Sequence, residues 1–375
     1  MRIAVATDAW FPQVNGVVRS LSTTIERIRR RGVVVETITP DLFRSVPCPT
    51  YPEIRLALAC KRGVAQRLDA FEPFAVHIAT EGPIGWAARA WCKRHRVPFT
   101  TSFHTRFPDY VSVRTGIPAD WIWKVMRWFH GAAERTFAVT QTLSSELVER
   151  GIGSVHHWPL GVDIEQFSPG VPQHLDMKGL ERPIQLYVGR VAIEKNLEAF
   201  LQTQFEGTKV IVGDGPALTE LKQKYPETIF LGAKHGLDLA SAYASADVFV
   251  FPSRTDTFGL VNIEALASGL PVAAYPVAGP LDIIGPKGFG MHGGKRRIGA
   301  LHEDLAQAIR LALTADRAAC AEEGARYEWD LCTDRFLEGL AWRHGSGHPA
   351  ANDVVIGEEG KVAEVKPKAG KATKR

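Results

Sequence analysis

The chain has 375 residues, of which 45% are hydrophobic and 23% charged, a composition typical of a soluble globular protein with more than one domain. No apolar run approaches the roughly 20 residues that span a bilayer, and the first residues lack the features of a secretory signal. We therefore expect a cytoplasmic protein. Five widely spaced cysteines without a CxxC motif disfavour structural disulfides and a zinc site.

The formal net charge of +4 hides an asymmetry between the two parts of the chain. Residues 1–160 carry 21 Lys and Arg against 13 Asp and Glu, whereas residues 161–345 carry 18 against 24. A basic part and an acidic part indicate that the two face different partners.

Short apolar strands alternate with amphipathic helices along the whole chain, which predicts parallel sheets with right-handed crossovers. The pattern occurs twice and restarts after a Pro- and Gly-containing stretch at 165–180. The predicted strands are 2–7, 33–39, 75–80, 98–103 and 136–140 in the first part and 184–189, 208–213, 228–232, 247–253 and 270–275 in the second.

The segment 316–343 also has a helical pattern, and the chain from 345 onward has no aromatic residue. We predict four parts: a first Rossmann-like domain, a second Rossmann-like domain, a helix that packs back on the first domain, and a disordered basic tail. Their limits are 1–165, 166–325, 326–345 and 346–375.

Two cations follow a strand of the second part. Arg190 comes directly after Gly189 at the strand end, and Lys195 lies five residues later. Cations at the C-terminal edge of a parallel sheet are typical of a diphosphate site. The spacing alone equally fits two surface cations.

A loop and helix further along offer two carboxylates. Asp256 precedes a helix that begins near Gly259, where backbone N–H groups can approach a phosphate. Glu264 lies inside that helix among apolar residues. Carboxylates at these two places are suited to two sets of hydroxyls on one ligand. The alternatives are a loop or cap carboxylate and a solvated helix face.

Other signals disfavour two kinds of nucleotide site: a metal-held diphosphate site and a dinucleotide site. The chain contains no D-x-D, the usual carboxylate pair for a metal-held diphosphate, so we expect a reaction without metal. Gly213-Asp214-Gly215 lacks the third glycine of G-x-G-x-x-G, and the first strand is not followed by that motif. Both observations disfavour a nicotinamide or flavin enzyme, and Gly213 is interpreted as a tight turn beside the predicted diphosphate site.

Taken together, several motifs resemble the family-four retaining glycosyltransferases, which have the GT-B fold of two facing Rossmann-like domains. The resemblance runs from residue 1 to about 343. It rests on FPQVNGVVRSL, TSFHT, LGVDIEQFSP, VGRVAIEKN, VGDGP, FLGAKHG, SRTDTFGLVNIEALASGLPV and PVAGPLDII.

The resemblance implies that the first Rossmann-like domain, 1–165, holds the acceptor and that the second, 166–325, binds the nucleotide sugar. It also implies roles for individual residues. His104 would contact the transferred sugar, Arg190 and Lys195 would bind the diphosphate, and Asp256 and Glu264 would hold the sugar and the ribose. The family usually has Glu where this chain has Asp256, which leaves the sugar open. A structural role is the alternative for His104. The remaining implied donor contacts are Gly16, Gly189, Gly213, Lys234, Phe258, Gly259 and Leu260, and the implied acceptor contacts are Glu81, Thr105 and Arg106.

A candidate membrane surface lies in the basic first part. Ile122, Val125, Met126 and Phe129 fit a core-facing stripe of one helix, while Trp121, Lys124 and Trp128 form another face. Trp beside Lys is typical of a membrane interface, and anionic lipid would attract the basic clusters at 27–31 and 93–96. Packing inside the protein and a solvated basic face are the alternatives. No nucleic-acid-binding module is evident.

We therefore expect a retaining hexosyltransferase that moves a hexose from GDP-mannose or a UDP-hexose to a hydroxyl acceptor. The resemblance favours a membrane lipid, such as diacylglycerol or a phospholipid, as acceptor, and an enzyme on the inner face of the cell membrane. The nucleotide sugar is a co-substrate, and no cofactor is expected. Three alternatives stay open: a transferase for a soluble saccharide or exopolysaccharide, a GT-B nucleotide-sugar epimerase, and a non-catalytic nucleotide-sugar-binding protein.

Overall fold

The structure, a computed structural model, describes residues 1–13, 15–48, 51–104, 116–256, 258–291 and 294–343. It is a mixed α/β protein with two six-stranded parallel sheets, which confirms the predicted fold class. The chain divides into two compact units. One unit comprises 1–13, 21–100 and the C-terminal end from 340, and the other comprises 14–20 and 101–339. The predicted domain limits stay predictions, and the tail lies outside the described residues.

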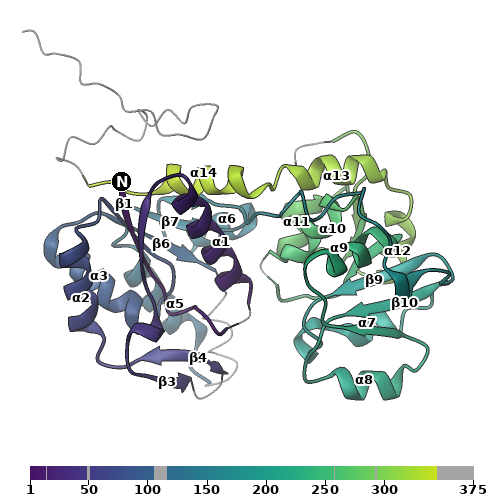
Figure 1. Cartoon of the computed structure of the whole chain (residues 1–375), viewed down its shortest axis with the longest axis horizontal. Helices are drawn as coiled ribbons and strands as arrows, with labels where there is room; N and C mark the ends of the chain where they lie inside the picture. Colours follow the sequence, from purple (N-terminus) through teal and green to yellow (C-terminus); the bar gives the residue numbers. More distant parts are fainter. Residues whose placement is uncertain (14, 49–50, 105–115, 257, 292–293, 344–375) are drawn as a thin grey trace, which may run out of the picture. The chain divides into compact units, whose positions relative to one another are not determined.

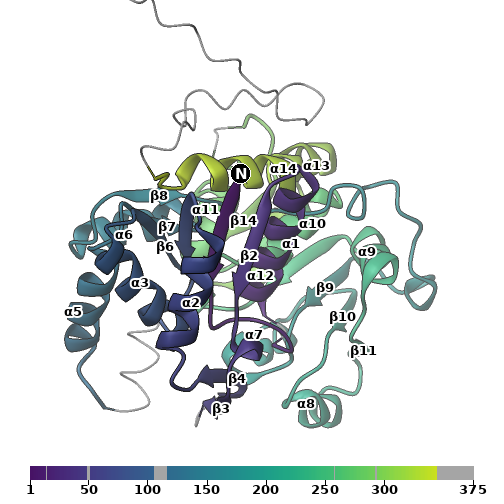
Figure 2. The same cartoon turned by 60° about the vertical axis from the view of Figure 1, so that its left-hand side comes forward.

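The first sheet has the strand order β2-β1-β5-β6-β7-β8. Its strands are short and most of their residues are buried, as expected for parallel strands covered on both faces. Figure 2 labels β2, β6, β7 and β8 of this sheet together with α1, α2 and α3. The strands are β1 (Arg2–Ala6), β2 (Val34–Ile38), β5 (Ala75–Ile78), β6 (Phe99–Phe103), β7 (Arg135–Ala138) and β8 (Val155–His157), and the helices are α1 (Gly16–Arg30), α2 (Lys61–Phe71), α3 (Pro83–His95), α5 (Ala119–His130) and α6 (Gln141–Glu149).

A buried carboxylate fixes the start of α3. Asp8, which follows β1, accepts hydrogen bonds from the backbone N–H groups of Ile84 and Gly85 and from the Thr80 hydroxyl. A methyl group on Gly82 would lie 2.4 Å from Cγ of Asp8, so only glycine fits there. Desolvation raises the pKa of Asp8 to about 6, because the N–H donors offset only part of the cost of burying the charge.

Two antiparallel strands, β3 (Ser45–Cys48) and β4 (Tyr51–Ala57), form a separate small sheet that the sequence did not predict. Each strand contains a proline, which weakens the strand signal. The short helix η1 (Pro40–Leu42) precedes them.

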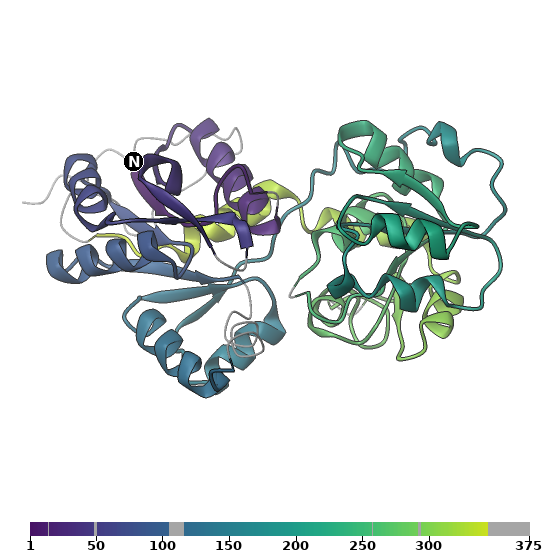
Figure 3. The ribbon, with the colours of Figure 1, turned by 90° about the horizontal axis from the view of Figure 1, so that it is seen from below.

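The second sheet has the strand order β11-β10-β9-β12-β13-β14. Figure 1 labels β9 and β10 with their helices, and Figure 3 shows the same sheet from below. The strands are β9 (Ile184–Val188), β10 (Thr208–Val212), β11 (Ile229–Gly232), β12 (Val248–Phe251), β13 (Val272–Ala274) and β14 (Gly299–Leu301), and the helices are η2 (Leu175–Met177), η3 (Ile193–Lys195), α7 (Leu197–Leu201), α8 (Leu218–Lys224), α9 (Gly236–Ser245), α10 (Leu260–Ala267), α11 (Ala278–Ile284), α12 (Leu305–Ala312), α13 (Arg317–Ala325) and α14 (Trp329–Gly339).

One face of this sheet is covered by α7, α8 and α12. Phe200 of α7, Leu221 of α8 and Ile309 of α12 join the inward side chains Ile211 and Val250 of the strands in a single apolar cluster. Full burial of such side chains contributes about 1.5–3 kcal/mol each. This packing holds the strand ends, and hence the loops that follow them, in fixed positions.

The predicted helical segment at 316–343 consists of two helices, α13 and α14, separated by residues 326–328. Helix α14 packs on β7 and β8: the Trp158 indole N–H donates to the carbonyl of Cys332 at 3.1 Å, and the ring centroids of Trp158 and Phe336 are 5.0 Å apart.

The predicted core stripe of α5 is partly wrong. Met126 and Phe129 are buried as expected, but Val125 is 46% exposed, and Trp123 is buried in its place. Trp123 stacks on Phe103 of β6, with ring centroids 5.5 Å apart, because an aromatic ring buries more apolar area than valine. Trp121 and Trp128 are exposed, as predicted for the outer face.

None of the helices in the described ranges is long and apolar enough to cross a bilayer.

Candidate active site

Most of the predicted donor residues follow strands of the second sheet at its C-terminal edge. Strands β9 and β12 are neighbours there, while their following connections run to opposite sides of the sheet. Such a switch point leaves a crevice outside the carboxyl ends of the strands, where α/β proteins bind ligands. The loop with Arg190 follows β9, and the loop with Asp256 follows β12.

Two glycines allow the ends of the neighbouring strands β9 and β10 to approach each other closely. Gly189 and Gly213 have φ values of +149° and +146°. A methyl group on Gly213 would lie 1.9 Å from the carbonyl oxygen of Gly189, and one on Gly189 would lie 2.8 Å from the Tyr187 hydroxyl. Both positions therefore require glycine, and the tight turn predicted at Gly213 has a steric cause.

The loop with Lys195 is tied to the loop after β12. Asn196 has a left-handed φ of +55° and donates its amide N–H to the carbonyl of Pro252 at 3.1 Å. The Lys195 ammonium then lies 2.5 Å from Oδ1 of Asp256, with each side chain about one-quarter exposed. This ion pair therefore joins Lys195, which is predicted to bind the diphosphate, to Asp256, which is predicted to bind the sugar.

Two groups at this edge are open to a ligand. Oδ2 of Asp256 is buried and accepts no hydrogen bond from the residues that the structure describes. The exposed Arg190 guanidinium likewise forms no ion pair with any described residue. A buried acceptor without a donor is costly, and a ligand hydroxyl would satisfy it.

Helix α10 begins at the same edge. Gly259 precedes it with φ +79°, and a methyl group there would lie 2.7 Å from the Asn262 amide and 2.9 Å from the Phe251 ring. Phe258 is buried and meets Tyr327 edge to face, while Leu260 is half-buried. The N-terminus of α10, whose first N–H groups have no partner inside an α-helix, therefore follows the loop at this edge of the sheet.

Glu264 is 2% exposed, which excludes the solvated helix face as its environment. Its Oε2 accepts a hydrogen bond from the Tyr243 hydroxyl at 2.9 Å, and its Oε1 lies 2.6 Å from the Arg19 guanidinium, in the same compact unit. Burial and the adjacent carboxylate raise the pKa of Tyr243 well above its ordinary value, so the hydroxyl stays protonated and donates.

Sequence reasoning missed Tyr243 and Arg19. The apolar spacing of α9 gives Tyr243 the pattern of a core residue, and Arg19 is one of several arginines in α1. A buried carboxylate among apolar residues does require a cation and a donor, so the environment predicted for Glu264 was the available signal.

The remaining predicted residues have separate settings. His104 follows β6 and meets Trp158 edge to face, with ring centroids 5.9 Å apart. Lys234 follows β11 at the donor edge, and Glu81 follows β5. Gly16 is the first residue of α1, where a methyl group would make only an ordinary contact with Leu260, so the chain itself does not require glycine. Thr105 and Arg106 lie outside the described residues.

The site offers charge and hydrogen bonds to a ligand. Arg190 and Lys195 are suited to a diphosphate, Asp256 and Glu264 to hydroxyls, and the α10 N-terminus to a further anionic oxygen. Among the described residues, no cluster of three His, Cys, Asp or Glu is placed to hold a metal ion.

Comparison with known proteins identifies two consecutive family regions. Residues 14–166 match Glycosyltransferase Family 4, and residues 177–327 match Glycosyl transferases group 1. The chain is 34% identical over 372 residues to a GDP-mannose-dependent alpha-mannosyltransferase of Mycobacterium tuberculosis, covering 90% of this chain and 95% of that protein.

A more distant relative has a name that refers to a lipid product. The chain is 27% identical to the alpha-monoglucosyldiacylglycerol synthase of Streptococcus pneumoniae, covering 84% of this chain and 79% of that protein. Among solved structures, the sucrose-phosphate synthase of Thermosynechococcus elongatus superposes with a TM-score of 0.65 at 20% identity, covering 89% of this chain and 97% of that one. At that identity the likeness shows the fold.

Proposed function

Because the chain belongs to the family-four glycosyltransferases and has their GT-B fold, we propose that it transfers a hexose from a nucleotide diphosphate sugar to a hydroxyl group of a membrane lipid, with retention of the anomeric configuration. The observation that carries the proposal is the Lys195–Asp256 pair, with a buried carboxylate oxygen still open beside the exposed Arg190. That arrangement places cations and a hydroxyl acceptor within one small site.

The proposed reaction breaks the bond between the sugar C1 and the donor phosphate oxygen and forms a bond from C1 to the acceptor oxygen. Arg190 and Lys195 stabilise the charge that develops on the leaving diphosphate. The departing phosphate oxygen takes the acceptor proton on the same face of the sugar. A side-chain nucleophile and a metal ion are then unnecessary.

The proposed donor is GDP-mannose, with a UDP-hexose as the alternative. The relative with 34% identity over nearly the whole chain is named as GDP-mannose-dependent, which supports the first choice. Asp256 would accept from sugar hydroxyls through its open oxygen, and Glu264 would exchange part of its contact with Arg19 for the ribose hydroxyls.

The proposed acceptor surface includes the outer face of α5, defined here as Trp121, Lys124, Val125 and Trp128. Trp121 and Trp128 are 64% and 58% exposed, and the Lys124 ammonium lies 4.6 Å from the Trp121 ring centroid. Exposed indoles beside a cation suit an anionic lipid surface, where the rings lie among headgroups. A peripheral enzyme docked through this face would meet a lipid hydroxyl.

The test is a transfer assay with purified protein, GDP-mannose or UDP-glucose, and vesicles that contain diacylglycerol or phosphatidylinositol. The proposal expects a glycolipid detected by mass spectrometry, with an α-linkage by NMR from an α-linked donor. Transfer only to water or to a soluble saccharide would reject the lipid as acceptor. An epimerised donor formed without any acceptor would reject the transferase in favour of an epimerase.

A further inference from the structure

Residues 252–256, which follow β12 and include Asp256, are called the β12 loop here. Two contacts described above reach this loop from the loop after β9. The Asn196 amide donates to the carbonyl of Pro252, and the Lys195 ammonium pairs with Asp256. Strand β12 lies between β9 and β13 in the sheet, so both contacts hold the β12 loop from the same side.

A third contact holds the β12 loop from the β13 side. The guanidinium carbon Cζ of Arg254 lies 3.7 Å from the centroid of the Tyr275 ring. Tyr275 is the residue that directly follows β13. A planar cation over the face of an aromatic ring is a favourable arrangement, and arginine is better suited to it than lysine.

The Tyr275 ring is a rigid surface for this contact. It is 6% exposed and belongs to the apolar cluster that contains Val250, Ala300 and Ile309. Close-packed side chains of a core occupy fixed positions. Arg254 therefore lies on a fixed part of the domain, although its own side chain is exposed.

Arg254 also contacts the loop after β14. Its Nη2 donates to Oε2 of Glu303 at 2.8 Å. Because both side chains are exposed, this ion pair contributes little stability by itself. Together with the Tyr275 ring, however, it fixes both the plane and the direction of the guanidinium. One side chain thus connects the β12 loop to the ends of β13 and β14.

We propose that Arg254 is a positioning residue for the donor sugar, because it holds the β12 loop so that Oδ2 of Asp256 can accept a sugar hydroxyl. Lys195 holds Oδ1 of Asp256 from the β9 side, and Arg254, two residues before Asp256, holds the loop from the β13 side. The Arg254 guanidinium is engaged by Tyr275 and Glu303, so it acts on the sugar through Asp256. The inference deepens the proposed function and rests on it for the role of Asp256.

The test measures how much the sugar adds to donor affinity. Titration calorimetry with the whole protein gives the Kd values of GDP-mannose and GDP, and of UDP-glucose and UDP. We define the sugar ratio as the Kd of the nucleoside diphosphate divided by that of its nucleotide sugar, for the pair that the wild type binds more tightly. Arg254→Ala should lower the sugar ratio about fivefold and change the affinity for nucleoside diphosphate less than about twofold.

A double variant tests whether Arg254 acts through Asp256. Asp256→Asn alone should lower the sugar ratio at least as much as Arg254→Ala. Adding Arg254→Ala to Asp256→Asn should then lower it by less than a further twofold, since residues that act through one contact have non-additive effects.

Variants of the ring and of a second arginine provide controls. Tyr275→Phe keeps the ring and should keep the sugar ratio, whereas Tyr275→Leu removes the ring and should lower it. Arg310 of α12 is a matched control, because its guanidinium lies 5.5 Å from the Phe205 ring centroid and Phe205 packs on the same apolar cluster. Arg310→Ala should leave every affinity unchanged.

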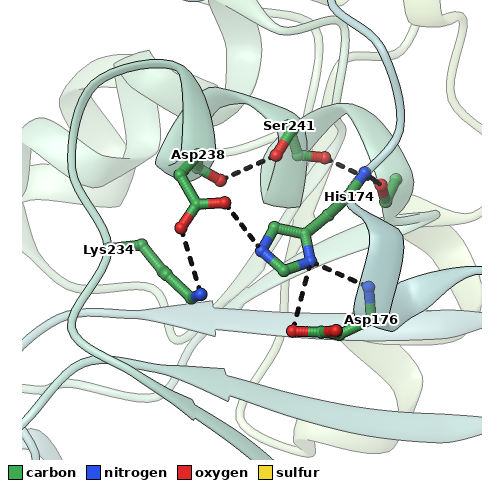
Figure 4. Close-up of polar contacts among 6 residues, drawn as sticks. His174, Asp176, Lys234, Asp238 and Ser241 are labelled. Carbon is green, nitrogen blue, oxygen red and sulfur yellow. Dashed lines mark hydrogen bonds and ion pairs between the residues drawn. The ribbon is translucent and has the colours of Figure 1, made fainter.

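A separate group of contacts on the β11 side controls for the loss of any ion pair. There the His174 Nε2 lies 3.0 Å from Oδ1 of Asp238, and the Lys234 ammonium lies 3.0 Å from Oδ2 (Figure 4). None of these three residues is in the β12 loop. Asp238→Asn should therefore leave the sugar ratio unchanged, because it alters the affinities for nucleoside diphosphate and nucleotide sugar equally.

Three results would overturn the inference. One is a sugar ratio that changes less than about twofold in Arg254→Ala. Another is an equal loss of affinity for nucleoside diphosphate and nucleotide sugar in that variant, which would make Arg254 a direct ligand of the diphosphate. The third is additive losses in the double variant. Failure of the proposed function is a separate outcome, because a wild type that transfers no hexose rejects the reaction, while a sugar ratio that depends on Arg254 keeps this inference.

Discussion

Lys195 and Asp256 are 61 residues apart in the chain, yet the ammonium of one lies 2.5 Å from Oδ1 of the other. Each residue therefore neutralises the charge of the other. A bound diphosphate would share the ammonium, and the open Oδ2 of Asp256 would accept a sugar hydroxyl. In the proposed reaction, the pair would thus link the leaving diphosphate to the transferred sugar.

We expect Lys195→Ala and Arg190→Ala each to reduce kcat/KM by about 10²-fold or more, since each removes a charge-assisted contact to a leaving group that gains charge. Initial rates over a range of donor concentrations measure the effect. Lys224→Ala is the control, because Lys224 is an exposed lysine of the same sheet unit that pairs with Glu198. Normal kinetics in both site variants would reject the diphosphate assignment.

The two carboxylates should differ in what they bind. Glu264→Gln should weaken the binding of nucleoside diphosphate about tenfold, because its proposed partner is the ribose and Arg19 would lose its counter-ion. Asp256→Asn should reduce transfer while the affinity for nucleoside diphosphate stays within about threefold, since its proposed partner is the sugar. Calorimetry with the free nucleoside diphosphate measures this affinity in both variants. An equal loss of affinity in the two variants would contradict the assignment of Glu264 to the ribose and Asp256 to the sugar.

Transfer should persist in excess chelator. The chain has no D-x-D, and its donor edge supplies the cations Arg190 and Lys195 with the N-terminus of α10. The measurement is the rate with EDTA and after adding back magnesium or manganese. A rate that falls with EDTA and returns with metal would show that a bound ion supports the diphosphate.

The outer face of α5 should hold the protein on anionic vesicles. The double variant Trp121→Ser with Trp128→Ser should lower vesicle binding severalfold, because it removes exposed ring area that the lipid would bury. Lys124→Glu should also lower vesicle binding severalfold, because it removes about 1 kcal/mol of attraction to the anionic surface. Salt should weaken binding, since the Debye length falls. Flotation with phosphatidylglycerol vesicles measures it. Val148→Ser, at another exposed apolar side chain, is the control, and equal flotation of all variants would reject the face.

Asp8 gives a pH dependence with a defined sign. Its pKa in the folded protein is about 6, above the ordinary 3.8, so folding disfavours its charged form. Stability from this group is fully present below about pH 4 and is lost as the pH rises to about 6, by roughly 2–3 kcal/mol. The melting temperature of the wild type minus that of Asp8→Asn should therefore fall across this range, and a constant difference would contradict the assignment.

The alternation of strands and helices was predictable because parallel strands buried on both faces are short apolar runs that differ clearly from amphipathic helices. Hence β9 to β13, and the loops with Arg190 and Asp256, were found from the sequence. The hairpin β3–β4 was missed, since proline weakens both strand signals, and β14 has only three residues.

The partners of the site residues were less accessible to prediction. The contacts of Arg19 with Glu264 and of His174 with Asp238 join segments that are far apart in the chain. No local sequence pattern indicates that these segments meet, so these partners could not be predicted. On α5, helical spacing alone did not distinguish Trp123 from Val125, because the deciding factor is the space beside Phe103 in the neighbouring strand.

The close backbone contact between Gly189 and Gly213 has a consequence for redesign of the donor preference. Side chains cannot be introduced at either strand end without displacing the backbone, so those two positions are fixed in any variant library. Variation that changes the accepted nucleotide or sugar must come from the neighbouring loops after β11 and β12. A library confined to Ala233, Lys234, His235 and Thr255 samples those loops while the scaffold beneath stays intact.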